Sequence, residues 1–269
     1  MPRLQLANGL YLGYQIIDFV DPWQPHETVL LHHGLAKFGT YWMPWYRILA
    51  RHFRVVTLDM LGNGASSKPR GHTWGLEGYA ADAQELLAAL DIDRVHFVGE
   101  GLGGCVGIQW AATKPDRIAT LTLASTPYRP ARGNVSLADT SKEVARQGLD
   151  YWIDKSVANR MRWSERPPEE YAWYRAQRAK TSPRILAEQM AAQATVDLEP
   201  LLPRVQAPTL LIVPGQSHVD AHDQMIRMGE AIPRSTVVEF PDEGQWVTFA
   251  RPDECVAAFL DFVAAAQQA

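Results

Sequence analysis

The chain has 269 residues, a formal net charge of −4 and 46% hydrophobic residues. This length fits a single α/β domain, and the composition is typical of a soluble globular protein rather than a disordered or membrane-embedded one. No block of like charges and no long apolar run occurs, so we expect no nucleic-acid partner and no membrane partner. The expected partner is a small-molecule ligand, and a homodimer is left open.

The cysteines Cys105 and Cys255 are far apart and lack the close spacing of zinc sites or secreted disulfide frameworks. We expect two buried thiols, no metal and no cofactor. The start of the chain, Met1-Pro2-Arg3-Leu4, carries no apolar signal segment. A cytoplasmic location is therefore the expectation.

Short apolar runs rich in β-branched residues predict the buried strands of a parallel sheet. They cover residues 28–31, 55–58, 95–98, 121–123, 209–213 and 237–240. Apolar residues recur at helical spacing between Tyr79 and Leu90 and between Val256 and Val263. This alternation predicts an α/β fold in which helices cover both faces of a mostly parallel sheet.

Residues 128–203 break the alternation, because they contain several prolines and helix-like stretches but no strand-like run. We predict a helical cap inserted between two parts of one core, residues 1–127 and 204–269. The segment carries the aromatic residues Trp152, Trp163, Trp173 and Tyr174. These rings either fill the interior of the cap or together form an apolar lid over a pocket.

Ligands of open α/β sheets bind beyond the carboxyl ends of the strands, so the loops that follow the strands are informative. The first three buried strands are followed by His32-His33-Gly34-Leu35, by Asp59-Met60-Leu61-Gly62-Asn63-Gly64-Ala65-Ser66, and by Gly99-Glu100-Gly101-Leu102-Gly103. These loops resemble those of the α/β-hydrolase superfamily, and the layout resembles its capped branch of enol-lactonases, carboxylesterases and carbon-carbon bond hydrolases. By this resemblance the backbone N–H groups of Leu35 and Leu102 form an oxyanion hole, and Asp59 holds its own turn.

The resemblance also implies three catalytic positions, and none of them holds the residue that the superfamily uses. Gly101 stands at the nucleophile, His218 at the acid and Gln245 at the histidine. Without a hydroxyl or thiol at position 101 no acyl-enzyme forms by the family route. A glutamine has no titratable proton near neutral pH and cannot be the general base. The sequence therefore predicts a degenerate catalytic triad.

The remaining candidates for proton transfer are His218, Glu100 and His33. Each has a structural alternative, since His218 can fill a solvent-facing loop, while Glu100 and His33 can hold the turn around Gly101 and the loop that carries Leu35 in shape. We place Trp246 and Phe38 in the wall of the same pocket.

Two functions follow from these residues. In the first, the protein binds a small ester, lactone or keto acid-like compound under the cap and acts on it as a non-serine hydrolase, lyase or decarboxylase, using the oxyanion hole. In the second, it is a catalytically inactive pseudo-hydrolase that only binds the ligand. Fold resemblance by itself does not choose between them.

Overall fold

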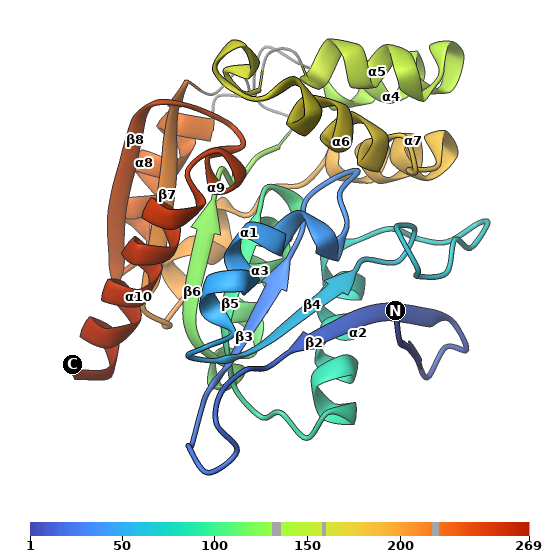
Figure 1. Cartoon of the computed structure of the whole chain (residues 1–269). Helices are drawn as coiled ribbons and strands as arrows, with labels where there is room; N and C mark the ends of the chain where they lie inside the picture. Colours follow the sequence, from blue (N-terminus) through green and yellow to red (C-terminus); the bar gives the residue numbers. More distant parts are fainter. Residues whose placement is uncertain (131–135, 158–159, 217–220, 269) are drawn as a thin grey trace.

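The computed structural model describes residues 1–130, 136–157, 160–216 and 221–268. Within these residues one eight-stranded sheet has the order β1-β2-β4-β3-β5-β6-β7-β8 (Figure 1). The strands are β1 (Arg3–Gln5), β2 (Tyr11–Ile17), β3 (Thr28–His32), β4 (Arg54–Asp59), β5 (Val95–Glu100), β6 (Ile118–Ala124), β7 (Thr209–Gln216) and β8 (Ser235–Gly244).

The six predicted strands are confirmed as β3 to β8, and they pair in parallel throughout. β1 and β2 were not predicted. They extend the sheet at one edge, where β2 pairs antiparallel with β4 and β1 pairs antiparallel with β2. These two strands are only partly buried, so they lack the continuous apolar run that marks a buried parallel strand. The sheet is mostly parallel, as predicted.

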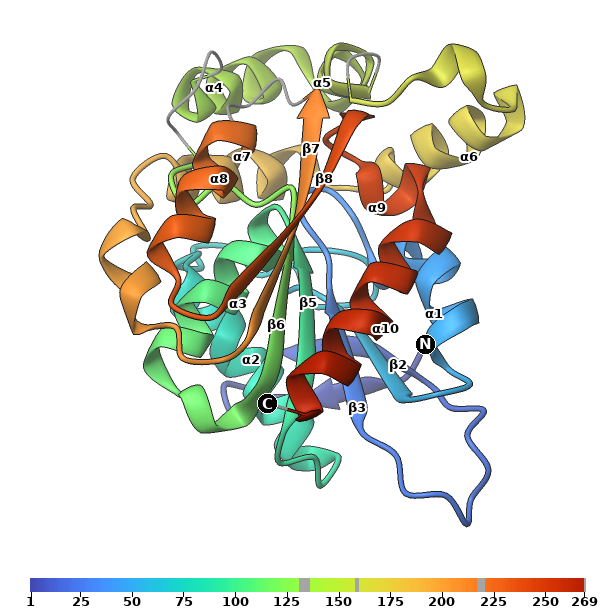
Figure 2. The same ribbon diagram turned by 90° about the vertical axis from the view of Figure 1, so that its left-hand side faces the viewer.

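Helices cover both faces of the sheet (Figure 2). Those of the sheet domain are α1 (Met43–Leu49), α2 (Leu76–Ala89), α3 (Leu102–Thr113), α8 (Ala221–Ala231), α9 (Val247–Ala250) and α10 (Pro252–Gln268), with the short 3-10 turns η1 (Gly39–Trp42) and η2 (Pro115–Arg117). On one face Leu86 of α2, Trp110 of α3 and Met225 of α8 share one apolar cluster. On the other face Leu49 of α1 and Phe259 of α10 share a second cluster.

A helical segment lies between β6 and β7, above the carboxyl ends of the parallel strands (Figure 1). It contains α4 (Leu137–Gln147), α5 (Leu149–Val157), η3 (Trp163–Glu165), α6 (Pro168–Arg178) and α7 (Pro183–Gln193). We call α4 to α7 the cap helices. Two of them begin at a serine N-cap, since Ser136 accepts a hydrogen bond from the Asp139 amide at 3.1 Å and Ser182 precedes Pro183 at the first helical position.

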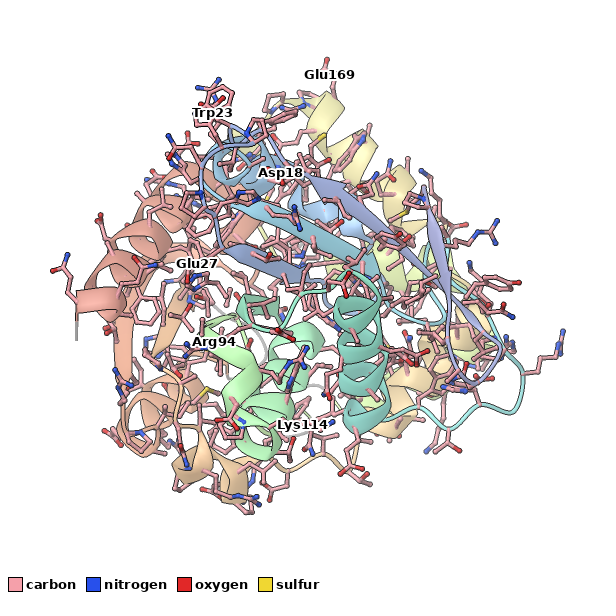
Figure 3. The ribbon with its side chains drawn as sticks, turned by 90° about the horizontal axis from the view of Figure 1, so that it is seen from below. Asp18, Trp23, Glu27, Arg94, Lys114 and Glu169 are labelled. Carbon is pink, nitrogen blue, oxygen red and sulfur yellow. The ribbon has the colours of Figure 1, made fainter. Side chains whose placement is uncertain are left out.

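The segment returns to the sheet domain through η4 (Glu199–Arg204), whose Leu202 packs in the same cluster as α3. Figure 3 shows the opposite end of the molecule, where Glu27 and Arg94 directly precede β3 and β5 and Lys114 follows α3. Cys105 and Cys255 are free and buried, as predicted. Over the part of the chain described, we find no helix with the length and apolar character needed to cross a membrane.

Candidate active site

A tight turn joins β5 to α3 at the carboxyl edge of the sheet. Glu100 ends the strand, Leu102 begins the helix, and Gly101 between them has φ 54° and ψ −117°. Glycine adopts this positive φ without the steric penalty that other residues meet. A Cβ atom added to Gly101 would meet nothing within 4 Å, so the space in front of the turn is open.

The glycines on either side of the turn are required by close backbone contacts. A Cβ atom on Gly99 would lie 2.5 Å from the Gly103 carbonyl oxygen, and one on Gly103 would lie 2.2 Å from the His32 carbonyl oxygen. Because α3 packs directly on the ends of β5 and β3, any side chain at these two positions would push the helix away. The Gly-x-x-x-Gly spacing thus reflects the strand-turn-helix geometry.

The loop after β3 lies against the same turn. A Cβ atom on Gly34 would be 2.9 Å from the Glu100 carbonyl oxygen and 3.8 Å from the Leu102 amide nitrogen. The amides of Leu35 and Leu102 donate no hydrogen bond to another described residue. Leu102 is the first residue of α3, where a helix leaves its N–H groups free for an outside acceptor.

A cavity of about 110 Å³ lies between this turn and the cap helices. Leu35, Gly101, Leu102, Gln245 and Trp246 lie in its wall. The cap and its connections contribute Pro130, Leu137, Thr140, Trp152, Arg160, Arg178, Met190 and Gln193. The cavity therefore has the position expected of a ligand site in an open α/β sheet.

Phe38 does not line this cavity, contrary to the expectation from the sequence. It faces a separate hollow of about 10 Å³, which Lys37 and Tyr41 also line. Lys37 borders both spaces, so its side chain stands between Phe38 and the ligand cavity.

A wider hollow of about 370 Å³, with Arg94 and Arg234 in its wall, lies away from the turn and outside the cap.

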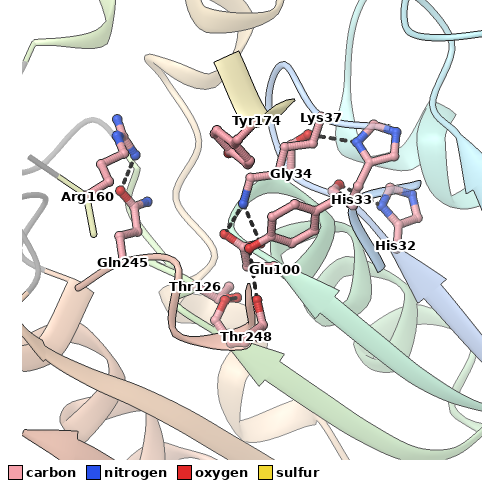
Figure 4. Close-up of polar contacts among 12 residues, drawn as sticks. His32, His33, Gly34, Lys37, Glu100, Thr126, Arg160, Tyr174, Gln245 and Thr248 are labelled. Carbon is pink, nitrogen blue, oxygen red and sulfur yellow. Dashed lines mark hydrogen bonds and ion pairs between the residues drawn. The ribbon is translucent and has the colours of Figure 1, made fainter. Parts of the chain in front are cut away.

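The floor of the cavity holds a buried ion pair. The Lys37 ammonium donates to both carboxylate oxygens of Glu100, and both side chains are nearly inaccessible to solvent (Figure 4). The ammonium also lies 3.8 Å from the centre of the Tyr41 ring. Burial lowers the pKa of Lys37 to about 7, helped by the charges of Arg178 and Arg160, although Glu100 opposes the shift.

Two guanidinium groups line the upper wall. Arg178, the last residue of α6, is 3% exposed and donates to the Tyr174 hydroxyl at 3.0 Å. Its guanidinium lies 4.3 Å from the Trp152 ring centre and 5.2 Å from that of Trp246. Arg160 donates to the side-chain oxygen of Gln245 (Figure 4). Desolvation and the charge of Arg178 lower the pKa of Arg160 to about 10.

His33 is held by hydrogen bonds on both sides of its ring. Its Nδ1 donates to the Gly34 carbonyl oxygen at 2.7 Å, and its Nε2 accepts from the Met60 amide at 3.0 Å. Burial lowers its pKa to about 4, so the ring is neutral near pH 7. This arrangement leaves no ring nitrogen for a ligand and corresponds to the structural alternative considered for His33.

The Asp59 turn is built as the motif predicts. The Asp59 carboxylate accepts from the Gly39 amide at 2.7 Å and from the Ala65 amide at 2.8 Å. Gly62 and Gly64 have φ 90° and 49°, which glycine adopts readily. Asp59 thereby ties η1 and the following loop to the end of β4.

His218 lies outside the described residues, so the structure does not place it. Gln245 lies in the cavity wall together with Gly101. Cys105 also lies there, but its thiol donates to the Pro127 carbonyl oxygen at 3.2 Å, and burial raises its pKa to about 12. A thiol with this pKa is almost wholly protonated near neutral pH and is a poor nucleophile.

Sequence reasoning missed the cavity residues Lys37, Arg160 and Arg178. Lys37 lies only two residues beyond Leu35, and that closeness to a predicted oxyanion loop was the one available signal. Arg160 and Arg178 lie in the cap segment, where helical periodicity gives no information about which side faces a cavity. Only the tertiary structure brings these three cations together.

The sheet order, the elbow at Gly101 and the helical segment above it define a protein of the α/β-hydrolase class. The family described as "alpha/beta hydrolase fold" matches residues 27–252, so the chain belongs to this family. RutD of Agrobacterium fabrum, whose name gives it a proposed carbamate hydrolase activity, is 25% identical over 249 residues, covering 90% of this chain and 94% of RutD.

Two further comparisons extend over nearly the whole chain. The 2-hydroxy-6-oxo-2,4-heptadienoate hydrolase of Pseudomonas putida is 26% identical over 278 residues, covering 98% of this chain and 96% of that enzyme. The enol-lactonase of Burkholderia xenovorans superposes with a TM-score of 0.89 at 26% identity, covering 98% of this chain and all of that structure. Two of these three proteins are thus named as hydrolases and the third as a lactonase.

Proposed function

We propose that this protein binds a small carbonyl compound in the cavity under the cap helices and acts on it without a covalent serine. The observation that carries the proposal is the turn at Gly101, which keeps the shape of a nucleophile elbow but presents no side chain to the cavity. The triad positions have, on this proposal, lost the serine, acid and histidine, while the backbone of the site is retained.

The amides of Leu35 and Leu102 are the proposed oxyanion hole. They donate no hydrogen bond to another described residue, and their residues line the same cavity as Gly101. Backbone donors of this kind stabilise negative charge on a carbonyl oxygen as it becomes an enolate or a tetrahedral intermediate. The names of the relatives, a carbamate hydrolase, an oxo acid hydrolase and an enol-lactonase, all refer to compounds that contain a carbonyl group.

The pair Glu100 and Lys37 is the proposed proton-transfer group. The Glu100 carboxylate can accept a proton from the carbon beside the carbonyl, while the Lys37 ammonium returns a proton to the product. A pKa of about 7 suits Lys37 to this task near neutral pH. His218 stays a second proposed proton-transfer residue.

A catalytically inactive, ligand-binding pseudo-hydrolase is the alternative function. The observation in its favour is the hydrogen bond from Arg160 to Gln245, because it uses the side chain at the former histidine position for structure. In this alternative the Lys37–Glu100 pair only stabilises the floor of the cavity.

Deuterium exchange into 4-oxopentanoate, followed by proton NMR in D2O, tests the proposal. The protein should accelerate exchange beside the ketone, because the oxyanion hole stabilises the enolate and Glu100 removes the proton. Loss of a general base typically costs about 10²- to 10⁴-fold in rate, so Glu100→Gln should remove most of the acceleration. His218→Ala in the same assay measures the contribution of His218.

Glu169→Gln is the matched control, since Glu169 is an exposed acid of α6 (Figure 3). This variant should exchange at the wild-type rate. Binding of 4-oxopentanoate without any accelerated exchange would favour the pseudo-hydrolase. Equal acceleration by wild type and Glu100→Gln would show that Glu100 is not the base.

A further inference from the structure

The positive charges around the cavity exceed the negative ones. Among the described residues that line it, Lys37, Arg160 and Arg178 are cationic and Glu100 is the single acid. The ammonium of Lys37 neutralises Glu100 in a direct ion pair. Neither guanidinium makes an ion pair with a described carboxylate, so two positive charges remain in the wall of the cavity.

Arg178 is the more deeply buried of the two arginines, so its charge costs more to desolvate. Its side chain is 3% exposed, and its Nε has no hydrogen-bond partner among the described residues. The hydrogen bond to Tyr174 and the rings of Trp152 and Trp246 satisfy only part of the guanidinium. Cation–π contacts are worth far less than the desolvation of a buried charge, and the C-terminus of α6 offsets only a fraction of it.

Arg160 is held beside Arg178 by the residue at the former histidine position. The Gln245 side-chain oxygen accepts a hydrogen bond from Arg160, and both residues line the cavity. Lys37, Arg160 and Arg178 lie 5.4, 5.9 and 5.2 Å from the centre of the Trp246 ring, so the three cations are close enough to repel one another. A negative group bound beside the two guanidinium groups would relieve this repulsion.

We propose that the guanidinium groups of Arg178 and Arg160 form an anion subsite that binds the carboxylate of a small organic acid. The planar donors of arginine match a carboxylate in geometry, and the remaining wall is apolar, with Trp152, Met190 and Leu137. Gln245 is a positioning residue, because it orients Arg160 instead of acting as a base. The inference rests on the cavity of the proposed function and narrows its ligands to keto acids and related acids.

Calorimetric titration with three compounds of equal carbon number separates this subsite from the carbonyl chemistry. Pentanoate carries only the carboxylate, 2-pentanone only the ketone, and 4-oxopentanoate both. We expect pentanoate and 4-oxopentanoate to bind, and 2-pentanone to bind at least about tenfold more weakly, as expected for loss of a charge-assisted hydrogen-bonded pair. Equal affinities for pentanoate and 2-pentanone would overturn the proposal. Because pentanoate has no ketone, the result is independent of whether exchange is catalysed.

The variants Arg178→Met and Arg160→Met should each weaken pentanoate binding at least about tenfold. Methionine replaces much of the buried volume without the charge, so the unliganded Arg178→Met protein should melt at or above the wild-type temperature. A purely structural Arg178 would give the opposite pair of results, a lower melting temperature and unchanged pentanoate affinity. Arg146→Met on the exposed side of α4 is the matched control and should behave as wild type.

Arg178→Lys provides a second test if Arg178→Met fails to fold. Lysine keeps the charge and most of the stem but lacks the planar pair of donors. Pentanoate affinity should fall several-fold in a protein with wild-type circular dichroism. Wild-type affinity in both Arg178→Lys and Arg160→Met would contradict the subsite.

Discussion

Buried polar side chains near the elbow fall into two groups according to their hydrogen-bond partners. His33 and Asp59 use their polar atoms to hold backbone amides and carbonyls in place. Arg178 and the amides of Leu35 and Leu102 retain donor capacity that the described chain does not use. Because an unused buried donor is costly, the second group indicates where a ligand completes the structure.

The buried His32 should make the stability of the fold depend on pH. It is fully buried, its Nε2 has no hydrogen-bond partner among the described residues, and burial lowers its pKa to about 3. A lowered folded-state pKa means that the unfolded chain binds the extra proton between about pH 6.5 and pH 3, so stability is lost as the pH falls through this range. At pH 5 the loss from this histidine is about 2 kcal/mol.

His32→Leu should therefore make the free energy of unfolding less steeply dependent on pH, by about one proton between pH 6 and pH 4.5. Urea denaturation at several pH values measures this slope. The exposed His52 serves as the control, and His52→Leu should keep the wild-type slope. An unchanged slope in His32→Leu would mean that His32 takes up a proton as readily in the fold as in the unfolded chain.

At the scale of elements, the joint between β3, β5 and α3 determines where the site lies. The helix begins so close to both strand ends that Gly103 and Gly99 admit no Cβ, whereas Gly101 faces open space. Packing thus requires glycine at position 103, whereas at position 101 only the φ of 54° favours glycine. Packing therefore leaves room for a larger side chain at position 101 but not at position 103.

Alanine substitutions at the two glycines should separate packing from backbone strain. Gly103→Ala drives a methyl group into the His32 carbonyl oxygen and should destabilise by roughly 3 kcal/mol, as overpacking does. Gly101→Ala meets no atom, so it should cost only the backbone strain of a positive φ with ψ −117°, about 1–2 kcal/mol. Urea denaturation of both variants measures the difference. Equal losses would show that α3 can shift away from β3.

The whole molecule brings together loops from three distant parts of the chain. Gly34 comes from the loop after β3, Gly101 from the turn after β5 and Gln245 from the end of β8, yet all three line one cavity. The cap helices close it from above and add Arg178 and Trp152. A function at this site therefore depends on the complete fold, and not on any one motif.

Restoration of the three family residues tests whether this assembly keeps catalytic geometry. The wild type should neither hydrolyse p-nitrophenyl acetate above background nor react with a fluorophosphonate probe, because it lacks an activated nucleophile. The triple variant Gly101→Ser, His218→Asp and Gln245→His should gain esterase activity, at least about tenfold above each single variant, since triad members act as a unit. A folded but inactive triple variant would mean that the three loops no longer hold these side chains in catalytic geometry.

The sequence by itself determined the class of fold, six of the strands and the turn at Gly101. These features are local, because buried parallel strands are continuous apolar runs and a strand-turn-helix joint requires glycine at fixed spacing. It did not determine β1 and β2, which are only partly buried and therefore lack a continuous apolar run, or the direction in which Phe38 points. Only the tertiary structure decided that Lys37 pairs with Glu100, and that Arg160 and Arg178 share one cavity. Charges far apart in sequence become neighbours only when the cap helices pack over the sheet, so their interaction energy has no local signature.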